Sequence, residues 1–94
     1  MRNFTDEDYQ DLKKQIENFK TQYPNRITQP NIIFCVAGDQ ETQNFANQVV
    51  EKFKNDGEQI QFASMFSIGM IPKQNFSVSD SPEGSILIEV HPKF

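Results

Sequence analysis

The residues best placed for chemistry are Asp39 and Glu41, within Ala37-Gly38-Asp39-Gln40-Glu41-Thr42. They follow a short apolar run and open a helical stretch, and open α/β sheets bind ligands where parallel strands end in this way. An anion site would need free backbone N–H groups and the helix dipole. The two acids already occupy that positive end, and a single glycine is not a phosphate loop. We therefore interpret Asp39 as a helix cap and Glu41 as a complement to the dipole. If this loop contacts a ligand or partner, the candidate residues are Gly38, Asp39, Glu41 and Thr42.

Carboxylates are also the ligands that Mg²⁺ and Ca²⁺ prefer. Four acids could converge on such a cation: Asp39, Glu41, Asp80 and Glu83. Their spacing matches no metal-binding motif, so we predict neither a metal nor any other cofactor.

Cys35 and His91 are the only cysteine and the only histidine. Cys35 lies in the apolar run 32–36, which predicts a small buried hydrophobe rather than a reactive thiol. It also excludes an intrachain disulfide, and suits a reducing compartment such as the cytoplasm or the cytoplasmic side of a membrane. His91 is predicted to be an exposed tail residue. A triad needs a nucleophile and an orienting acid beside the histidine, so we assign no catalytic residue.

An apolar stretch in a loop forms the second candidate contact surface. It contains Phe66, Ile68 and Ile71, with Gly69 and Pro72 between and after them. Two interpretations remain open: these side chains fold back onto the sheet, or they form an exposed patch that binds a partner.

The elements that must position these residues are well signalled in the first half of the chain. Thr5 can cap a helix, and an apolar stripe then recurs at three- and four-residue steps until Pro24. The stripe consists of Tyr9, Leu12, Ile16, Phe19 and Tyr23. Residues 31–37 predict a central strand covered on both faces. A second helix is predicted from about Gln40 to Asp56, before Gly57.

The second half of the chain predicts strands. Residues 59–66 indicate a half-exposed strand that forms a parallel βαβ unit with the first strand. Residues 76–78 could add a short strand, and 79–84 read as a turn. Residues 85–90 predict a last strand, with Ile86, Ile88 and Val90 inward and Glu89 outward. We place this strand at an edge of the sheet, with an antiparallel orientation favoured.

Length and charge limit the classes of function. Ninety-four residues make one domain, and the net charge is −4 without a cluster of Lys and Arg. Nucleic acid is therefore not an expected partner. No apolar run approaches the ~20 residues of a membrane span, so we expect no membrane insertion by this chain. The predicted fold is a small layered α/β sandwich, α-β-α-β-(β)-β, with two helices and three or four strands.

The order of these features resembles a known class of small domains. Phe4-Thr5-x-x-Asp8 opens a helix, Tyr23-Pro24 follows, and the segment 37–41 precedes Phe45-Ala46 and then Gly57. Over residues 4–62 this looks like the soluble domains that follow transmembrane helices in some uncharacterised bacterial membrane proteins. The resemblance implies a membrane-tethered parent protein and no known activity.

Two functions remain open from the sequence. The first is a non-enzymatic module that binds a protein partner or forms a homodimer, because the scaffold is well specified and a catalytic constellation is missing. The second is a flavodoxin-like or TIR-like nucleotide-responsive module or enzyme, with Asp39 and Glu41 at the strand end. Dimerisation through an exposed sheet edge is a third possibility.

Overall fold

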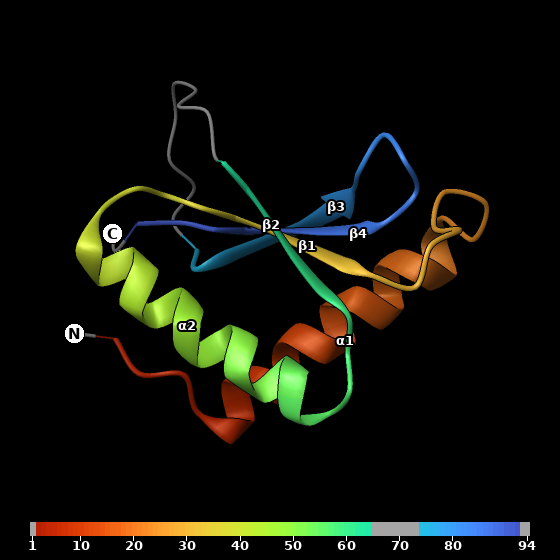
Figure 1. Ribbon diagram of the computed structural model, residues 1–94. Coiled ribbons are helices and arrows are strands. Elements are labelled where there is room, and N and C mark those ends of the chain that lie inside the picture. Colours follow the sequence, from red (N-terminus) through yellow and green to blue (C-terminus); the bar gives the residue numbers. More distant parts are fainter. Residues whose placement is uncertain (1, 65–73, 93–94) are drawn as a thin grey trace.

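The computed structural model describes residues 2–64 and 74–92, and it confirms the predicted small α/β fold (Figure 1). A four-stranded mixed sheet packs against two helices. The elements in chain order are α1 (Asp6–Gln22), β1 (Ile32–Val36), α2 (Gln40–Asn55), β2 (Ile60–Ser64), β3 (Phe76–Asp80) and β4 (Ile86–Val90). The short strand that the sequence left optional is thus a five-residue strand, β3.

The strands lie side by side in the order β2-β1-β4-β3. β1 pairs in parallel with β2 and β4, and β3 pairs antiparallel with β4. The prediction that the last strand lies at an edge is wrong. A tight turn, in which Ser81 N donates to Ser85 O over 2.8 Å, folds β3 and β4 into a hairpin. β3 therefore takes the edge position, and β4 is antiparallel to β3 but parallel to β1.

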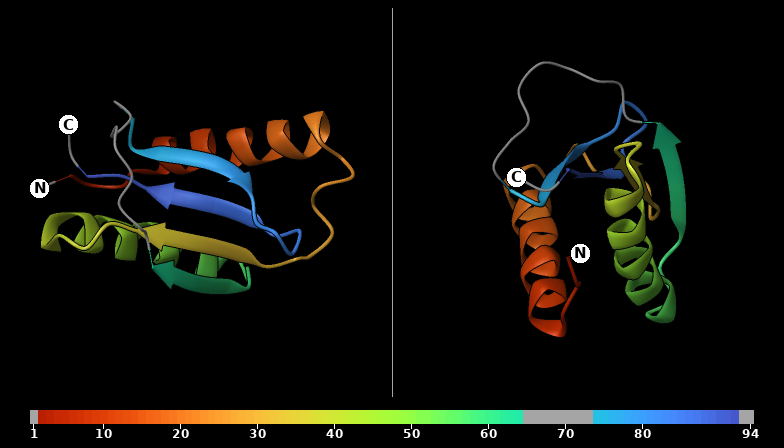
Figure 2. Two further views of the ribbon diagram at one scale, coloured as in Figure 1. Left: turned by 90° about the horizontal axis from the view of Figure 1, so that it is seen from above. Right: turned by 90° about the vertical axis from the view of Figure 1, so that its left-hand side faces the viewer.

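Both helices lie on the same face of the sheet (Figure 2). Ile32 and Phe34 of β1 face the helices and are buried, whereas Ile33 and Cys35 point to the opposite face and are half-buried. The predicted cover of β1 on both faces is therefore wrong. The chain has two one-sided helices, and both apolar stripes are used on the same face. The result is a two-layer sandwich with β1 in the interior of the sheet.

Local signals explain where the helices begin and end. Thr5 and Asp8 form a capping box, in which Asp8 N donates to Thr5 Oγ1 and Thr5 N donates to Asp8 Oδ2, both over 3.1 Å. α1 ends at Gln22, before Pro24. α2 is followed by Gly57, whose φ of 84° lies in the left-handed region that glycine adopts without strain.

Aromatic rings fill the space between the two helices and the sheet. Phe4, in the arm before α1, makes edge contacts with Tyr9, Phe45 and Phe76, with ring centroids 5.7–6.1 Å apart. Phe45 of α2 stacks on Phe76 of β3 at 5.5 Å. Edge and offset contacts of this kind suit the charge distribution of the rings. This cluster joins the N-terminal arm, α2 and the β3 edge into one core.

Candidate functional site

The loop at Gly38–Thr42 folds as a helix start. The carboxylate of Asp39 accepts hydrogen bonds from Thr42 N over 3.0 Å and from Thr42 Oγ1 over 2.8 Å. The side-chain hydrogen bond from Thr42 is the main reason that the pKa of Asp39 lies below its usual value. Asp39 is therefore the predicted cap, and it and Gly38 remain exposed, whereas Thr42 is buried.

Arg2 lies at the start of α2, where it contacts Glu41 and Thr42. Its Nη2 is 2.8 Å from Glu41 Oε1, and its Nε is 3.0 Å from Glu41 Oε2. Its Nη1 donates to Asn75 Oδ1 over 3.1 Å and to His91 O over 2.9 Å, and its guanidinium lies 4.3 Å from the centre of the Phe45 ring. No local pattern predicts this contact, because Arg2 and Glu41 lie 39 residues apart. Asp39 and Glu41 thus complement the positive end of α2, and Arg2 in turn pairs with Glu41.

The four acids considered as a cation site do not converge. Asp39 and Glu41 follow the end of β1, where Val36 is in register with Val90 at the end of β4. Asp80 is in register with Ile86 at the start of β4, so it lies at the opposite end of the sheet. Asp80 lies 3.8 Å from Arg26 instead. Among residues 2–64 and 74–92, no cluster of three or more His, Cys, Asp or Glu side chains could hold a metal ion.

His91 is not the exposed tail residue that the sequence predicts. Its side chain is buried, with Nε2 2.8 Å from Ser77 Oγ, and its backbone N donates to Asn75 O over 2.9 Å. The pairing of β4 with β3 continues one residue past Val90, and this extension brings His91 into the sheet. Ser77 Oγ also lies 3.0 Å from Gln74 Nε2. His91 therefore fixes the end of the hairpin.

Cys35 is half-buried on the sheet face that points away from the helices. It lies opposite Glu89 in the register of β1 and β4. Burial, and next the charge of Glu89, raise the pKa of the Cys35 thiol. A raised pKa favours the protonated, poorly nucleophilic thiol. The predicted burial of Cys35 is only partial, because its side chain lies on the sheet face that the helices do not cover.

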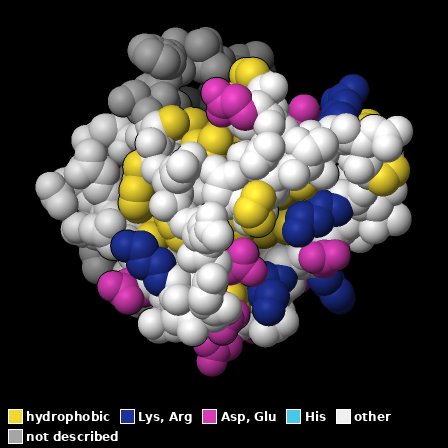
Figure 3. All heavy atoms as spheres, turned by 45° about the vertical axis from the view of Figure 1, so that its right-hand side comes forward, with side chains coloured by type: hydrophobic (Ala, Val, Ile, Leu, Met, Phe, Trp, Pro, Cys, Tyr) yellow, Lys and Arg dark blue, Asp and Glu magenta, His cyan; other side chains and the backbone are white. Residues whose placement is uncertain are grey.

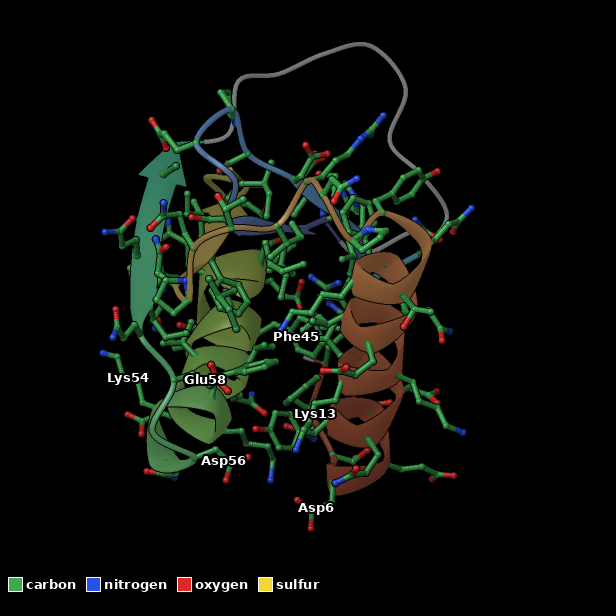
Figure 4. The ribbon with its side chains drawn as sticks, turned by 90° about the vertical axis from the view of Figure 1, so that its right-hand side faces the viewer. Asp6, Lys13, Phe45, Lys54, Asp56 and Glu58 are labelled. Atoms are coloured by element: carbon green, nitrogen blue, oxygen red, sulfur yellow. The ribbon has the colours of Figure 1, made fainter. Side chains whose placement is uncertain are left out.

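A narrow cleft between the helices is too small for a cofactor. Its volume is about 70 Å³, and it is bordered by Tyr9, Lys13 and Phe53 among others. Figure 4 shows Lys13 of α1 and Asp56 after α2 on the two sides of this gap, and the Lys13 ammonium is 3.8 Å from the Asp56 carboxylate. Cofactor pockets typically measure about 300–1,000 Å³. The Tyr9 hydroxyl donates to Asp56, and burial together with this contact raises the pKa of Tyr9.

The open edge of β2 is the most unusual surface of the described chain. Phe62 is 58% exposed, whereas the other large apolar side chains of the described residues are buried or half-buried. Gln61 and Ala63 beside it are exposed too. Edge strands are commonly protected by Lys, Pro or a covering segment, and residues 59–64 contain neither residue. The sequence predicted a half-exposed strand here, but it did not single out Phe62.

The register of β1 and β2 shows which backbone groups of β2 are free. In a parallel pair, one residue bonds through both its N–H and its C=O to the residues before and after its partner. Ile32 is in register with Ile60, and Ile32 N donates to Gln59 O over 2.9 Å. The groups of Gln59 and Gln61 therefore point to β1. Those of Ile60 and Phe62 point away from β1, toward the side of β2 on which no described strand lies.

A shallow groove lies beside this edge on the helix side. It has a volume of about 220 Å³ and is lined by Val36, Gln43, Ala46, Asn47 and Phe62. The lining is apolar and amide-bearing, without a charged side chain. Elsewhere on the surface, charged side chains are common. Figure 3 shows acidic and basic side chains close to one another, with apolar side chains between them. The groove can accept one apolar side chain from an added strand.

Comparison with family models, with curated proteins and with solved structures gave no match to this chain. Neither described helix has the length and apolarity that a membrane-spanning segment needs. The candidate contact residues Phe66, Ile68 and Ile71 lie outside the described residues.

Proposed function

We propose that this chain is a non-enzymatic protein-interaction module that binds an extended segment at the edge of β2. The single observation that carries the proposal is the exposure of Phe62, at 58%, on an uncharged strand whose outer side is unpaired within the described residues. Adding a strand to such an edge is a common mode of peptide recognition. Main-chain hydrogen bonds supply affinity, and alternate side chains supply specificity.

The geometry defines the segment that would fit. The outward N–H and C=O groups of Ile60 and Phe62 would pair with its backbone. Its side chains alternate between the two faces of the sheet. Those on the helix side meet Phe62 and the groove at Val36 and Ala46, so they should be apolar. Because the edge has no charge to offset one, we expect the bound segment to be uncharged.

The roles of Asp39 and Glu41 favour this proposal over a nucleotide-responsive module. Asp39 is used as a helix cap, and Glu41 is paired with Arg2 in contacts of 2.8–3.2 Å. A phosphate at this strand end would have to displace Arg2 from Glu41. The membrane-tethered location implied by the resemblance stays a prediction, which the sequences flanking this domain in a full-length gene product would address.

A peptide selection tests the proposal. Random seven-residue peptides would be displayed and selected on the full chain, and the selected peptides titrated into three proteins: wild type, Phe62→Pro and Val78→Pro. The Phe62→Pro change removes an outward N–H from β2. Val78→Pro is the matched control, because it also removes an outward N–H, from the other edge strand. Ser81 pairs with Ser85 and Asn75 with His91 through backbone hydrogen bonds between β3 and β4. Since hydrogen-bonded residues alternate along an antiparallel strand, the N–H of Val78 points away from β4.

We expect the selected peptides to be uncharged with apolar residues at every second position. Their affinity should fall at least about tenfold in Phe62→Pro, a change of roughly 1.4 kcal/mol. It should stay within about twofold in Val78→Pro. Peptides that bind all three proteins alike would show that the β2 edge is not the binding surface.

A further inference from the structure

We infer that the segment bound at the β2 edge is β2 of a second copy of this chain, so that two four-stranded sheets join across a two-fold axis. This inference rests on the proposed function and names its partner. Phe62 lies at the centre of β2 (Ile60–Ser64). A strand with its exposed apolar residue at the centre is complementary to itself when it is turned round.

Two-fold symmetry restricts the pairing. An axis perpendicular to the sheet makes the two β2 strands antiparallel and keeps the helices of both copies on one side. Residues that lie opposite each other must then point to the same face. A register centred on Phe62 meets this condition, because it places Phe62 opposite its counterpart and Ile60 opposite the Ser64 position of the second copy.

The same register satisfies the free backbone groups. In an antiparallel pair, directly opposed residues of the hydrogen-bonded kind exchange both N–H···O bonds. The outward-pointing residues of β2 are Ile60, Phe62 and Ser64, and these are the residues that the register places opposite one another. Each outward N–H and C=O therefore gains a partner. The two Phe62 rings come to lie side by side on the helix face, where each is now 58% exposed.

Charge also favours self-pairing at this edge. Residues 59–64 have no ionisable side chain, and α2 presents Gln43 and Asn47 beside Phe62. Lys54 follows Asn47 by seven residues on the same side of the helix. Antiparallel pairing brings Lys54 near Gln43 of the second copy rather than near its own counterpart. Pairing through residues 59–64 therefore brings no charged side chain of one β2 against the β2 of the other copy.

The size of the contact predicts a weak dimer. Stable interfaces bury about 1,200–2,000 Å² in total, more than two five-residue strands provide, so association should depend on concentration. Sedimentation equilibrium of the full chain, up to about 1 mM, would follow the average mass from 10.9 kDa toward twice that value. Phe62→Pro should weaken association at least about tenfold, and Phe62→Ala, which keeps the N–H, should weaken it less. Val78→Pro should associate like the wild type.

Three results would overturn the inference: a mass that stays at 10.9 kDa over the whole range, equal association of Phe62→Pro and wild type, or loss of association in Val78→Pro alone. Circular dichroism and urea unfolding of each variant would show that it is folded. The first result leaves the proposed function standing if selected peptides still bind the β2 edge, and both fail if neither peptides nor a second copy bind there.

Discussion

β2 and β3 are both edge strands of the sheet, yet the chain covers them differently. On β3, Phe76 is 9% exposed and the other residues are half-buried, because α1 lies against this strand (Figure 2). On β2, Phe62 is 58% exposed although α2 contacts both β1 and β2. Both strands are five residues long and carry Phe on the helix face. The position of the helix, more than the composition of the strand, therefore decides which edge stays open.

Polar contacts reinforce this difference. The β3 edge carries Asp80, which lies 3.8 Å from Arg26, and Ser77, which contacts His91 at 2.8 Å. Charged side chains, and side chains that already have hydrogen-bond partners, protect an edge strand from pairing with another strand. On β2, where residues 59–64 carry no ionisable side chain, Gln61 Oε1 accepts a hydrogen bond from Asn31 Nδ2 over 2.9 Å. Of the two edges in the described sheet, β2 is thus the less protected.

The largest difference in stability is expected between alanine variants of the phenylalanines in the two edge strands, Phe76 of β3 and Phe62 of β2. Phe76→Ala removes a buried ring that contacts Phe4 and Phe45, and should lower the free energy of unfolding by about 3–5 kcal/mol. Phe62→Ala removes a mostly exposed ring and should cost less than about 1 kcal/mol. Urea unfolding of both variants checks the contrast. Equal losses would mean that Phe62 is covered in solution.

The two glycines in the turns beside these edges give the next contrast. Gly84, in the β3–β4 hairpin, has φ +93°, and a Cβ there would collide with Thr28 Oγ1. Gly57, before β2, has φ +84° with open space around it. Gly57→Ala should cost about 1–2 kcal/mol from the left-handed conformation alone. Gly84→Ala adds overpacking of about 1–3 kcal/mol, and thermal unfolding should rank the two in this order.

Proline substitutions within β2 sharpen the account of its free groups. Gln61→Pro removes an N–H that points to β1 and leaves a carbonyl unpaired, which should cost about 1–3 kcal/mol. Phe62→Pro removes an outward N–H and should cost clearly less, since proline is tolerated where its nitrogen faces solvent. The measurement is urea unfolding at a concentration where the chain is monomeric. A larger loss in Phe62→Pro would reverse the assigned register.

The smallest effect concerns Asp39, at the end of β1. Its pKa is lower in the folded chain than the usual 3.8, mainly because of the hydrogen bond from Thr42. A carboxylate whose pKa is lowered by folding stabilises the folded state at pH values above its pKa in the unfolded chain. This stabilisation is lost as the pH falls through its lower pKa in the folded chain. Asp39→Asn should be close to neutral at pH 7, because Asn also caps helices, and should show a flatter stability profile below about pH 4. Profiles that superimpose in acid would contradict the assigned cap.

The sequence predicts the elements well because their signals are local. Thr5 and Asp39 cap the helices, Gly57 lies at the turn after α2, and the alternation of Ile86, Ile88 and Val90 reports which face of β4 is buried. Each of these signals involves neighbours a few residues apart. They are sufficient for the α/β class and the parallel βαβ unit.

The sequence could not predict features that depend on distant pairing. The interior place of β4 depends on β1, more than fifty residues earlier, and on the hairpin with β3. The contact of Arg2 with Glu41 and the burial of His91 follow from that arrangement. The open β2 edge is also a consequence of where α1 and α2 lie. The candidate site therefore became visible only when the sheet order was known.

Amide hydrogen exchange would show whether the outward N–H groups of β2 are open to solvent. In the dilute chain, the amides of Ile60 and Phe62 should exchange freely while those of Gln61 and Ala63 are protected by β1. Adding a selected peptide, or raising the protein concentration, should then slow exchange at Ile60 and Phe62 by at least about tenfold. Protection of Ile60 and Phe62 already in the dilute monomer would contradict the account, because the edge would then be covered before any partner binds.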